Sequence, residues 1–302
     1  PNEHVAERTV EIPRHFGVDN RLFGIVTMPE EMPKPASRRA FVFLNCGSEH
    51  HSGPHRMYTT LARKCASFGA LSFRFDIEGI GDSVTTGRNE DNNSYSPVAL
   101  EDIDQALSFL RDEYDCSEFI LNGICAGAYH AFKATANLAD HNIVEANLVN
   151  PLVFAWNYDD PDDHLRLEAS TYKSSVRHSR NWWRLVRGDV DYRRLARSIA
   201  TLLKAHLRRL AAIIKDLFLG GSTDGVSADL VQIVDLNRSL FLVLSDDDPG
   251  LDLLHIQAPR ETRKALRNKS LQVFGLTRAN HGLSKKHMQD QLVSVIASKY
   301  AP

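Results

Sequence analysis

The segment that most restricts the fold of this chain is an apolar run that ends in a glycine-rich turn and continues into helix-forming residues. The run is Phe119–Ile124, and the turn is Gly123-Ile-Cys-Ala-Gly127, with a cysteine at its centre. We expect a strand, a tight turn and a helix, because glycines two positions either side of the cysteine permit close backbone approach. Unpaired N–H groups and the dipole at a helix N-terminus stabilise a thiolate. Cys125 is therefore the candidate nucleophile, and the competing interpretation is an inert core cysteine.

Two later segments carry side chains that would complete a catalytic triad with this cysteine. The apolar run Ser239–Leu244 is followed by acids and a Pro-Gly turn, which places carboxylates at the C-terminal end of a predicted strand. Asp248 is our first choice for the acid, and Asp246 and Asp247 are its rivals. His281, in a predicted loop before the last amphipathic helix, is the candidate base. A strand cap or a solvated loop histidine would explain each residue separately, but the order nucleophile, acid, histidine favours a triad.

Composition indicates a globular protein and gives no general reason to expect nucleic-acid or membrane binding. The chain has 302 residues, 43% of them hydrophobic, and a formal net charge of −2 at pH 7. No apolar run is long enough to span a bilayer, and the N-terminal residues lack the basic-then-apolar pattern of a signal peptide. The four cysteines show neither metal-like nor disulfide-like spacing. We therefore expect a cytoplasmic protein with reduced thiols, and we predict no oligomeric state.

Strand and helix patterns alternate through the first half of the chain. Two alternating segments near the N-terminus predict an antiparallel pair of strands, and further strand and helix patterns then follow in turn up to residue 150. This alternation is typical of an α/β fold with a parallel sheet covered on both faces. We expect a core of residues 1–150 and 238–302, interrupted by a helical cap insertion at 151–237.

Three segments together resemble the α/β-hydrolase superfamily, in its broad aminopeptidase, esterase and thioesterase group. Arg74–Ser83 is similar to the R-x-D-x-x-G-x-G-x-S turn of these proteins, Leu121–Gly127 to their nucleophile elbow, and Ser245–Gly250 with His281 to their acid and base loops. The resemblance implies the α/β-hydrolase fold: a mostly parallel sheet, helices on both faces and a helical cap.

The chain departs from most members of that superfamily at Cys125, where serine is usual. Cysteine at this position resembles dienelactone hydrolases, polyhydroxyalkanoate synthases and the acyl- or aminoacyl-shuttling enzymes of non-ribosomal peptide pathways. The segments Asn45–Ser48 and Gly53–Arg56 resemble those of hydrolases from exported-polysaccharide and natural-product gene clusters. These groups catalyse different reactions, so the resemblance leaves the reaction open.

The fold that the resemblance implies also supplies an oxyanion hole. One N–H donor comes from the residue after the nucleophile, Ala126, and another from the loop after the third strand, at Gly47 or Ser48. Three histidines lie in that same loop: His50, His51 and His55. We expect no metal there, because the sequence offers neither the carboxylates nor the spacing of a zinc site.

The expected cap contains a basic amphipathic helix from about 192 to 218. Arg194, Arg197 and Arg208 stand largely off its apolar face, and Trp182 and Trp183 precede it. An ordinary solvated face explains these arginines. The alternative is a docking surface for an acidic carrier protein and its phosphopantetheine phosphate, since arginine pairs with phosphate through a planar fork.

Three functions remain open on the sequence. The first is acyl transfer or thioesterase chemistry through an acyl-cysteine intermediate, on a thioester borne by a carrier protein or by CoA, as expected in natural-product biosynthesis. The second is hydrolysis of small esters or lactones, as in dienelactone hydrolases. The third is a binding protein without catalysis. We expect no resident cofactor in any of them, although a substrate may bring phosphopantetheine or CoA.

Overall fold

The computed structural model of the chain describes residues 9–31, 38–88, 90–156, 225–246 and 248–301. Contacts divide the chain into two units, one made of Pro1–Phe154 with Val226–Pro302 and the other of Ala155–Gly225. Every helix and strand named below belongs to the first unit. Within the described ranges no helix has both the length and the apolar composition needed to cross a membrane.

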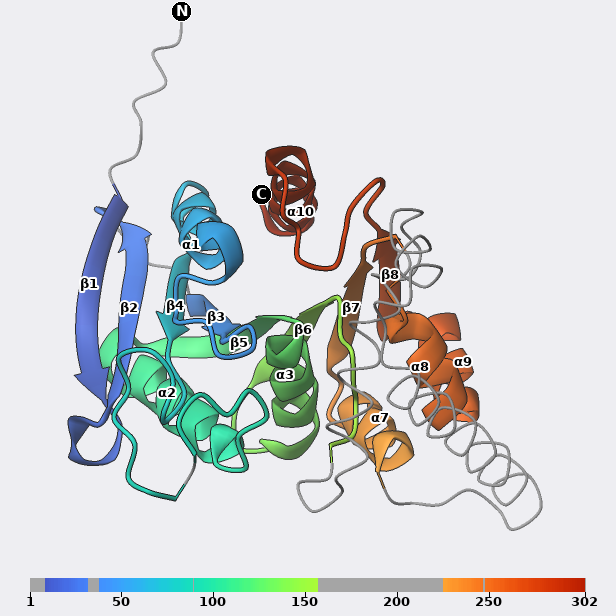
Figure 1. Ribbon diagram of the computed structural model, residues 1–302, viewed down its shortest axis with the longest axis horizontal. Helices are drawn as coiled ribbons and strands as arrows, with labels where there is room; N and C mark the ends of the chain where they lie inside the picture. The colour runs from blue at the N-terminus through green and yellow to red at the C-terminus, as the bar shows by residue number, and fades with distance from the viewer. Residues whose placement is uncertain (1–8, 32–37, 89, 157–224, 247, 302) are drawn as a thin grey trace, which may run out of the picture. The chain divides into compact units, whose positions relative to one another are not determined.

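An eight-stranded sheet forms the centre of this unit, in the order β1-β2-β4-β3-β5-β6-β7-β8 (Figure 1). The strands are β1 (Thr9–Phe16), β2 (Leu22–Pro29), β3 (Arg38–Leu44), β4 (Leu71–Phe75), β5 (Cys116–Ile124), β6 (Ile143–Val149), β7 (Ser239–Leu244) and β8 (Leu271–Gly275). The pairs β1–β2 and β2–β4 are antiparallel, and all neighbouring pairs from β4 to β8 are parallel. The predicted parallel sheet with an antiparallel start is confirmed.

Helices cover both faces of the sheet (Figure 1). Helices α1 (Met57–Ala66) and α10 (Lys286–Tyr300) contact each other and share one core cluster. The other face carries α2 (Ala99–Tyr114), α3 (Ala126–Asn137), α7 (Val226–Asp235), α8 (Gly250–Gln257) and α9 (Pro259–Arg267), which share the second cluster. Two short 3-10 helices, η1 (Val18–Asn20) and η2 (Pro54–Arg56), lie in loops.

Side-chain alternation along the strands produces these two layers. In β3, Ala40, Val42 and Leu44 enter the cluster beneath α2 and α3, whereas Phe41 and Phe43 enter the cluster beneath α1 and α10. All five side chains are almost completely buried. A strand buried on both faces is an apolar run rather than an alternating pattern, which is why parallel strands were recognisable here.

The structure corrects the predicted extent of the insertion. Helix α7 lies inside the range expected for the cap, but it packs against α3 and α9 and belongs to the unit that contains the sheet. The sequence pattern also missed α8 and α9 between β7 and β8. The basic helix expected at about 192 to 218 lies outside the described residues, as do Arg194, Arg197, Arg208, Trp182 and Trp183.

Candidate active site

Cys125 occupies a strained turn between β5 and α3. Its φ of 56° and ψ of −114° are values that a residue with a side chain rarely adopts. The turn is held from both sides. The Cys125 N–H donates to the carbonyl of Val149 in β6 (2.9 Å), and the Cys125 carbonyl accepts from the N–H of Ala128 in α3 (3.1 Å). The predicted strand, turn and helix are present, and Cys125 lies at the N-terminus of the helix.

The two glycines of this turn are required by close packing. A Cβ added to Gly123 would lie 2.0 Å from the backbone carbon of Gly127, and one added to Gly127 would lie 2.5 Å from the carbonyl oxygen of Leu44. Neither position has room for a side chain, because the atoms in the way are backbone atoms. The spacing of the motif therefore follows from the contact of α3 with β5 and with the end of β3.

His281 and Asp248 form a hydrogen-bonded pair beside the turn. His281 Nδ1 lies 2.7 Å from Asp248 Oδ1, and the side chains are 34% and 3% exposed, respectively. Of the three candidate acids, Asp248 is thus the one that is hydrogen-bonded to the histidine. Asp246 is exposed, and its N–H donates to the carbonyl of Ala279. Asp247 lies outside the described residues.

Asn150, which the sequence did not single out, ties the loops of the acid and the base to the sheet. It is completely buried directly after β6. Its side-chain Nδ2 donates to the carbonyl of His281 (2.8 Å) and to Ser245 Oγ (2.9 Å), and its Oδ1 accepts from the N–H of Ser245 (2.8 Å). The one visible signal in the sequence is a polar residue at the end of an apolar strand. Asn150 is a positioning residue for both loops.

The electrostatics favour a thiolate–imidazolium pair. A hydrogen bond from Cys46, together with the hydrogen bond and charge of His281 and the N–H of Ala126, outweighs burial and lowers the pKa of Cys125 to about 5. Burial lowers the pKa of His281, but the hydrogen bonds and charges of Asp248 and Cys125 outweigh it and raise the pKa to about 10. Between these two values the Cys125 thiol is deprotonated and the His281 ring is protonated, so both groups are charged.

Cys46 is the second site residue that the sequence did not identify. It is partly buried in the loop after β3. Its interaction with Cys125, and then burial, raise the pKa of Cys46 well above its ordinary value. Cys46 is therefore a protonated donor beside the Cys125 thiolate. The signal in the sequence was its position next to Gly47, in the loop already expected to face the turn.

The predicted oxyanion donors belong to the two segments that carry Cys125 and Cys46. Ala126 begins α3, and its N–H helps to lower the pKa of Cys125. Gly47 and Ser48 follow Cys46 in a turn closed by the N–H of Glu49 on the carbonyl of Cys46 (3.2 Å), and Gly47 has a φ of +61°. The choice between Gly47 and Ser48 as the second donor stays a prediction.

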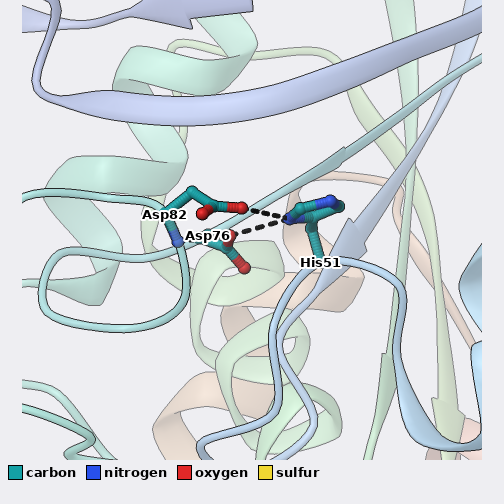
Figure 2. A group of neighbouring side chains, drawn as sticks. All are labelled: His51, Asp76 and Asp82. Atoms are coloured by element: carbon teal, nitrogen blue, oxygen red, sulfur yellow. Dashed lines mark hydrogen bonds and ion pairs between the residues drawn. The ribbon is translucent and has the colours of Figure 1, made fainter. Parts of the chain in front are cut away.

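A second histidine–aspartate pair holds this loop (Figure 2). The ring nitrogen Nδ1 of His51 lies 2.8 Å from Asp76 Oδ2 and 3.7 Å from Asp82 Oδ2. The sequence pattern shows no zinc-site carboxylates beside the loop histidines. The structure corrects this expectation, because the turn after β4 brings Asp76 and Asp82 to His51. These three residues offer ligand-type atoms within 4.8 Å of one another. His50 and His55 are exposed.

Hydrogen bonds within the protein account for both oxygens of the buried Asp76 carboxylate. Oδ1 accepts from Asn45 Nδ2 (2.8 Å), and Oδ2 accepts from the N–H of Asp82 (3.0 Å) as well as facing His51. Asn45 Oδ1 accepts in turn from the N–H of Ile77 (2.8 Å). This network joins the loop that carries Cys46 to the turn after β4, and we assign it that positioning role.

Comparison with known proteins defines the fold. No family model and no curated protein matches the sequence. Among solved structures, an esterase from Pyrococcus furiosus superposes with a TM-score of 0.57 at 13% identity, covering 100% of this chain and 94% of that one. The esterase Est22 gives 0.55 at 14% identity, with 97% and 79% covered. A serine hydrolase homologue from Coxiella burnetii gives 0.50 at 15%, with 97% of each chain covered.

These likenesses and the sheet order show that the protein has the α/β-hydrolase fold, as predicted. At such low sequence identities, these structural likenesses show the fold alone.

Proposed function

We propose that the protein is a hydrolase of small carboxylic esters or lactones, with Cys125 as its nucleophile. The observation that carries this proposal is the 2.7 Å hydrogen bond between Asp248 and His281, with His281 interacting electrostatically with Cys125 at a strained turn before a helix. The esterases among the solved structures of this fold support hydrolysis over the other two functions. The backbone strain at Cys125 supports catalysis over simple binding, because such strain concentrates at functional sites.

Acylation begins with the thiolate already formed. The sulfur of Cys125 attacks the ester carbonyl carbon, and the carbonyl oxygen becomes an oxyanion that the N–H of Ala126 and one N–H from Gly47 or Ser48 stabilise. Collapse of this intermediate breaks the bond to the leaving alcohol. The imidazolium of His281 gives its proton to that oxygen, and the charge on Asp248 keeps the ring in the required orientation.

Deacylation reverses these roles. The neutral ring of His281 takes a proton from a water molecule, which attacks the acyl carbon. The second intermediate expels the Cys125 thiolate and releases the carboxylic acid. The protein returns to the thiolate–imidazolium pair, so each turnover consumes one water and needs no cofactor.

Acyl transfer from a carrier-borne thioester was the first expectation from the sequence, and the described residues do not favour it. The arginines and tryptophans on which that expectation depended lie outside them. Transfer to an acceptor other than water requires a surface or pocket that recognises the acceptor. None of the described residues points to such a surface or pocket. We therefore keep transfer as an outcome of the test.

The test combines turnover with trapping of the acyl-enzyme. Wild-type protein is incubated with p-nitrophenyl esters of increasing chain length and with a lactone, and intact masses are recorded after rapid quenching. We expect turnover and an acyl group on Cys125. In Cys125→Ala we expect a loss of at least about 10³-fold, because removal of a triad nucleophile costs that much or more.

The matched control is Cys116→Ser. Cys116 is buried at the start of β5, and its thiol donates a hydrogen bond to the carbonyl of Tyr114. Serine keeps a donor at that position. This variant should match the wild type. Full turnover in Cys125→Ala, or an adduct elsewhere, would refute the assignment of the nucleophile. Acyl transfer to added pantetheine that outruns hydrolysis would identify a transferase.

A further inference from the structure

Cys46 and Cys125 are brought together by the sheet. Strands β3 and β5 are parallel neighbours, with Leu44 opposite Gly123. Cys46 and Cys125 each lie two residues beyond this pair. Gly127 packs against the carbonyls of Leu44 and Asn45, so the segments that follow the two strands stay close. Adjacent strands lie about 4.8 Å apart, a separation that falls within the Cα range of disulfides.

The other two cysteines are different in kind. Cys65 and Cys116 are each 1% exposed, in separate core clusters, and burial raises the pKa of both. Cys46 and Cys125 are partly exposed and share one environment, at the edge of the cluster beneath α1 and α10. A thiol reacts with oxidants when it has thiolate character and access, and a neighbouring thiol makes the oxidation reversible by resolving the product. In this chain the Cys46–Cys125 pair combines these features.

We propose that the candidate active site is also an oxidation site, in which a small hydroperoxide converts Cys46 and Cys125 into a reversible disulfide. The inference rests on the proposed function in one respect, since the same Cys125 thiolate serves as the nucleophile. It adds a second class of substrate, a peroxide, and a second product, a protein disulfide.

The reaction has two balanced steps. The Cys125 thiolate attacks one peroxide oxygen, the O–O bond breaks, and Cys125 becomes a sulfenic acid. The imidazolium of His281 protonates the leaving oxide, which departs as water or an alcohol. Cys46 then attacks the sulfenic sulfur, an S–S bond forms, the S–O bond breaks, and water leaves with the thiol proton. Two electrons pass from the two sulfurs to the peroxide, and an added dithiol returns them through exchange.

The disulfide would stop acyl hydrolysis and protect the nucleophile. Sulfur in a disulfide is not nucleophilic towards an ester, so turnover falls while the pair is oxidised. A sulfenic acid without a resolving thiol proceeds to sulfinic acid, which thiols do not reverse. Cys46 therefore separates reversible from irreversible loss of activity.

The test maps cysteine chemistry directly. Reduced full-length protein is treated with equimolar hydrogen peroxide, alkylated with N-ethylmaleimide after unfolding, and digested without reductant. In the wild type we expect the loss of two hydrogens, a cross-link between the Cys46 and Cys125 peptides, and alkylation at Cys65 and Cys116. Ester turnover should fall at least about tenfold and return with dithiothreitol, because the disulfide is reducible.

Variants separate the resolving thiol from a general effect of oxidation. Cys46→Ser and, as a second substitution, Cys46→Ala are treated with several equivalents of peroxide, because formation of a sulfinic acid consumes two. The cross-link should be absent, and Cys125 should gain oxygen atoms that dithiothreitol does not remove. Cys116→Ser should behave as the wild type. Oxygen on Cys125 beside a free Cys46 thiol in the wild type would overturn the proposal. So would both thiols remaining free under peroxide.

The two proposals fail separately. A cross-link in a protein that takes no acyl group would refute the hydrolase and leave the oxidation site. Acyl adducts on Cys125 without any cross-link under peroxide would refute the oxidation site and leave the hydrolase.

Discussion

Two histidine–aspartate pairs in this protein have nearly the same bond and different surroundings. His281 Nδ1 lies 2.7 Å from Asp248, and His51 Nδ1 lies 2.8 Å from Asp76. The ring of His281 is 34% exposed and also interacts electrostatically with Cys125. The ring of His51 is 10% exposed, and its aspartate also accepts from Asn45 and from the N–H of Asp82.

The difference shows what makes such a pair a candidate for catalysis. Both pairs have a carboxylate that orients the ring. The His281 ring also has a candidate nucleophile, Cys125, beside it. The Asp76 carboxylate serves several donors from two loops, and its role is to hold those loops together (Figure 2). A triad is recognised by the role of each member, and the bond between histidine and aspartate is not sufficient.

Removal of the two rings should separate the pairs most strongly. We expect His281→Ala to reduce kcat/KM for esters by about 10³-fold, because the general acid and base are lost together. His51→Ala should reduce it less than about tenfold and lower the free energy of unfolding by about 1–3 kcal/mol, since the buried Asp76 loses a partner. Steady-state kinetics and urea unfolding measure both. A greater loss of kcat/KM in His51→Ala would transfer the catalytic role to the Asp76 pair.

Neutralising the two acids gives a smaller contrast. We expect Asp248→Asn to reduce kcat/KM by about 10²-fold, because the amide favours the wrong tautomer of His281 and removes the charge that stabilises the imidazolium. The thiolate also loses part of its stabilisation, so alkylation of Cys125 by iodoacetamide at pH 6 should slow. Asp76→Asn is the matched variant and should leave that alkylation rate near the wild type. Equal slowing in both variants would mean that the assigned roles are wrong.

The pH profile offers the finest test. The pKa of Cys125 is lowered from its ordinary value to about 5, and that of His281 is raised to about 10. Thus kcat/KM should fall below the first value, as the thiolate is protonated, and above the second, as the imidazolium loses its proton. Cys46→Ala should move the acidic limb to higher pH, because a hydrogen bond to the thiolate is lost. His51→Ala should leave both limbs in place, and a profile that follows His51 instead would contradict the assignment.

Local patterns were sufficient for much of the fold and for the candidate triad. The turn around Cys125 was predictable because backbone atoms pack so closely there that only glycine fits at the flanking positions. The strands of the parallel sheet were predictable because burial on both faces leaves apolar runs. Helices α8 and α9 were missed since they follow the acids of the predicted strand end, where we expected only a turn. Helix α7 was assigned to the insertion because its contacts with α3 lie far away in the sequence.

The sequence by itself determined the order and chemistry of the candidate nucleophile, acid and base, and the fold class that holds them. Tertiary structure decided which acid meets His281, that Cys46 reaches the nucleophile, and that Asn150 ties His281 to the sheet across 131 positions of the chain. It also paired His51 with Asp76 rather than leaving it in solvent. The physical reason is the same in each case. A side chain's pattern along the chain reports its own burial and backbone, whereas its hydrogen-bond partner is set by which strand ends the sheet places side by side.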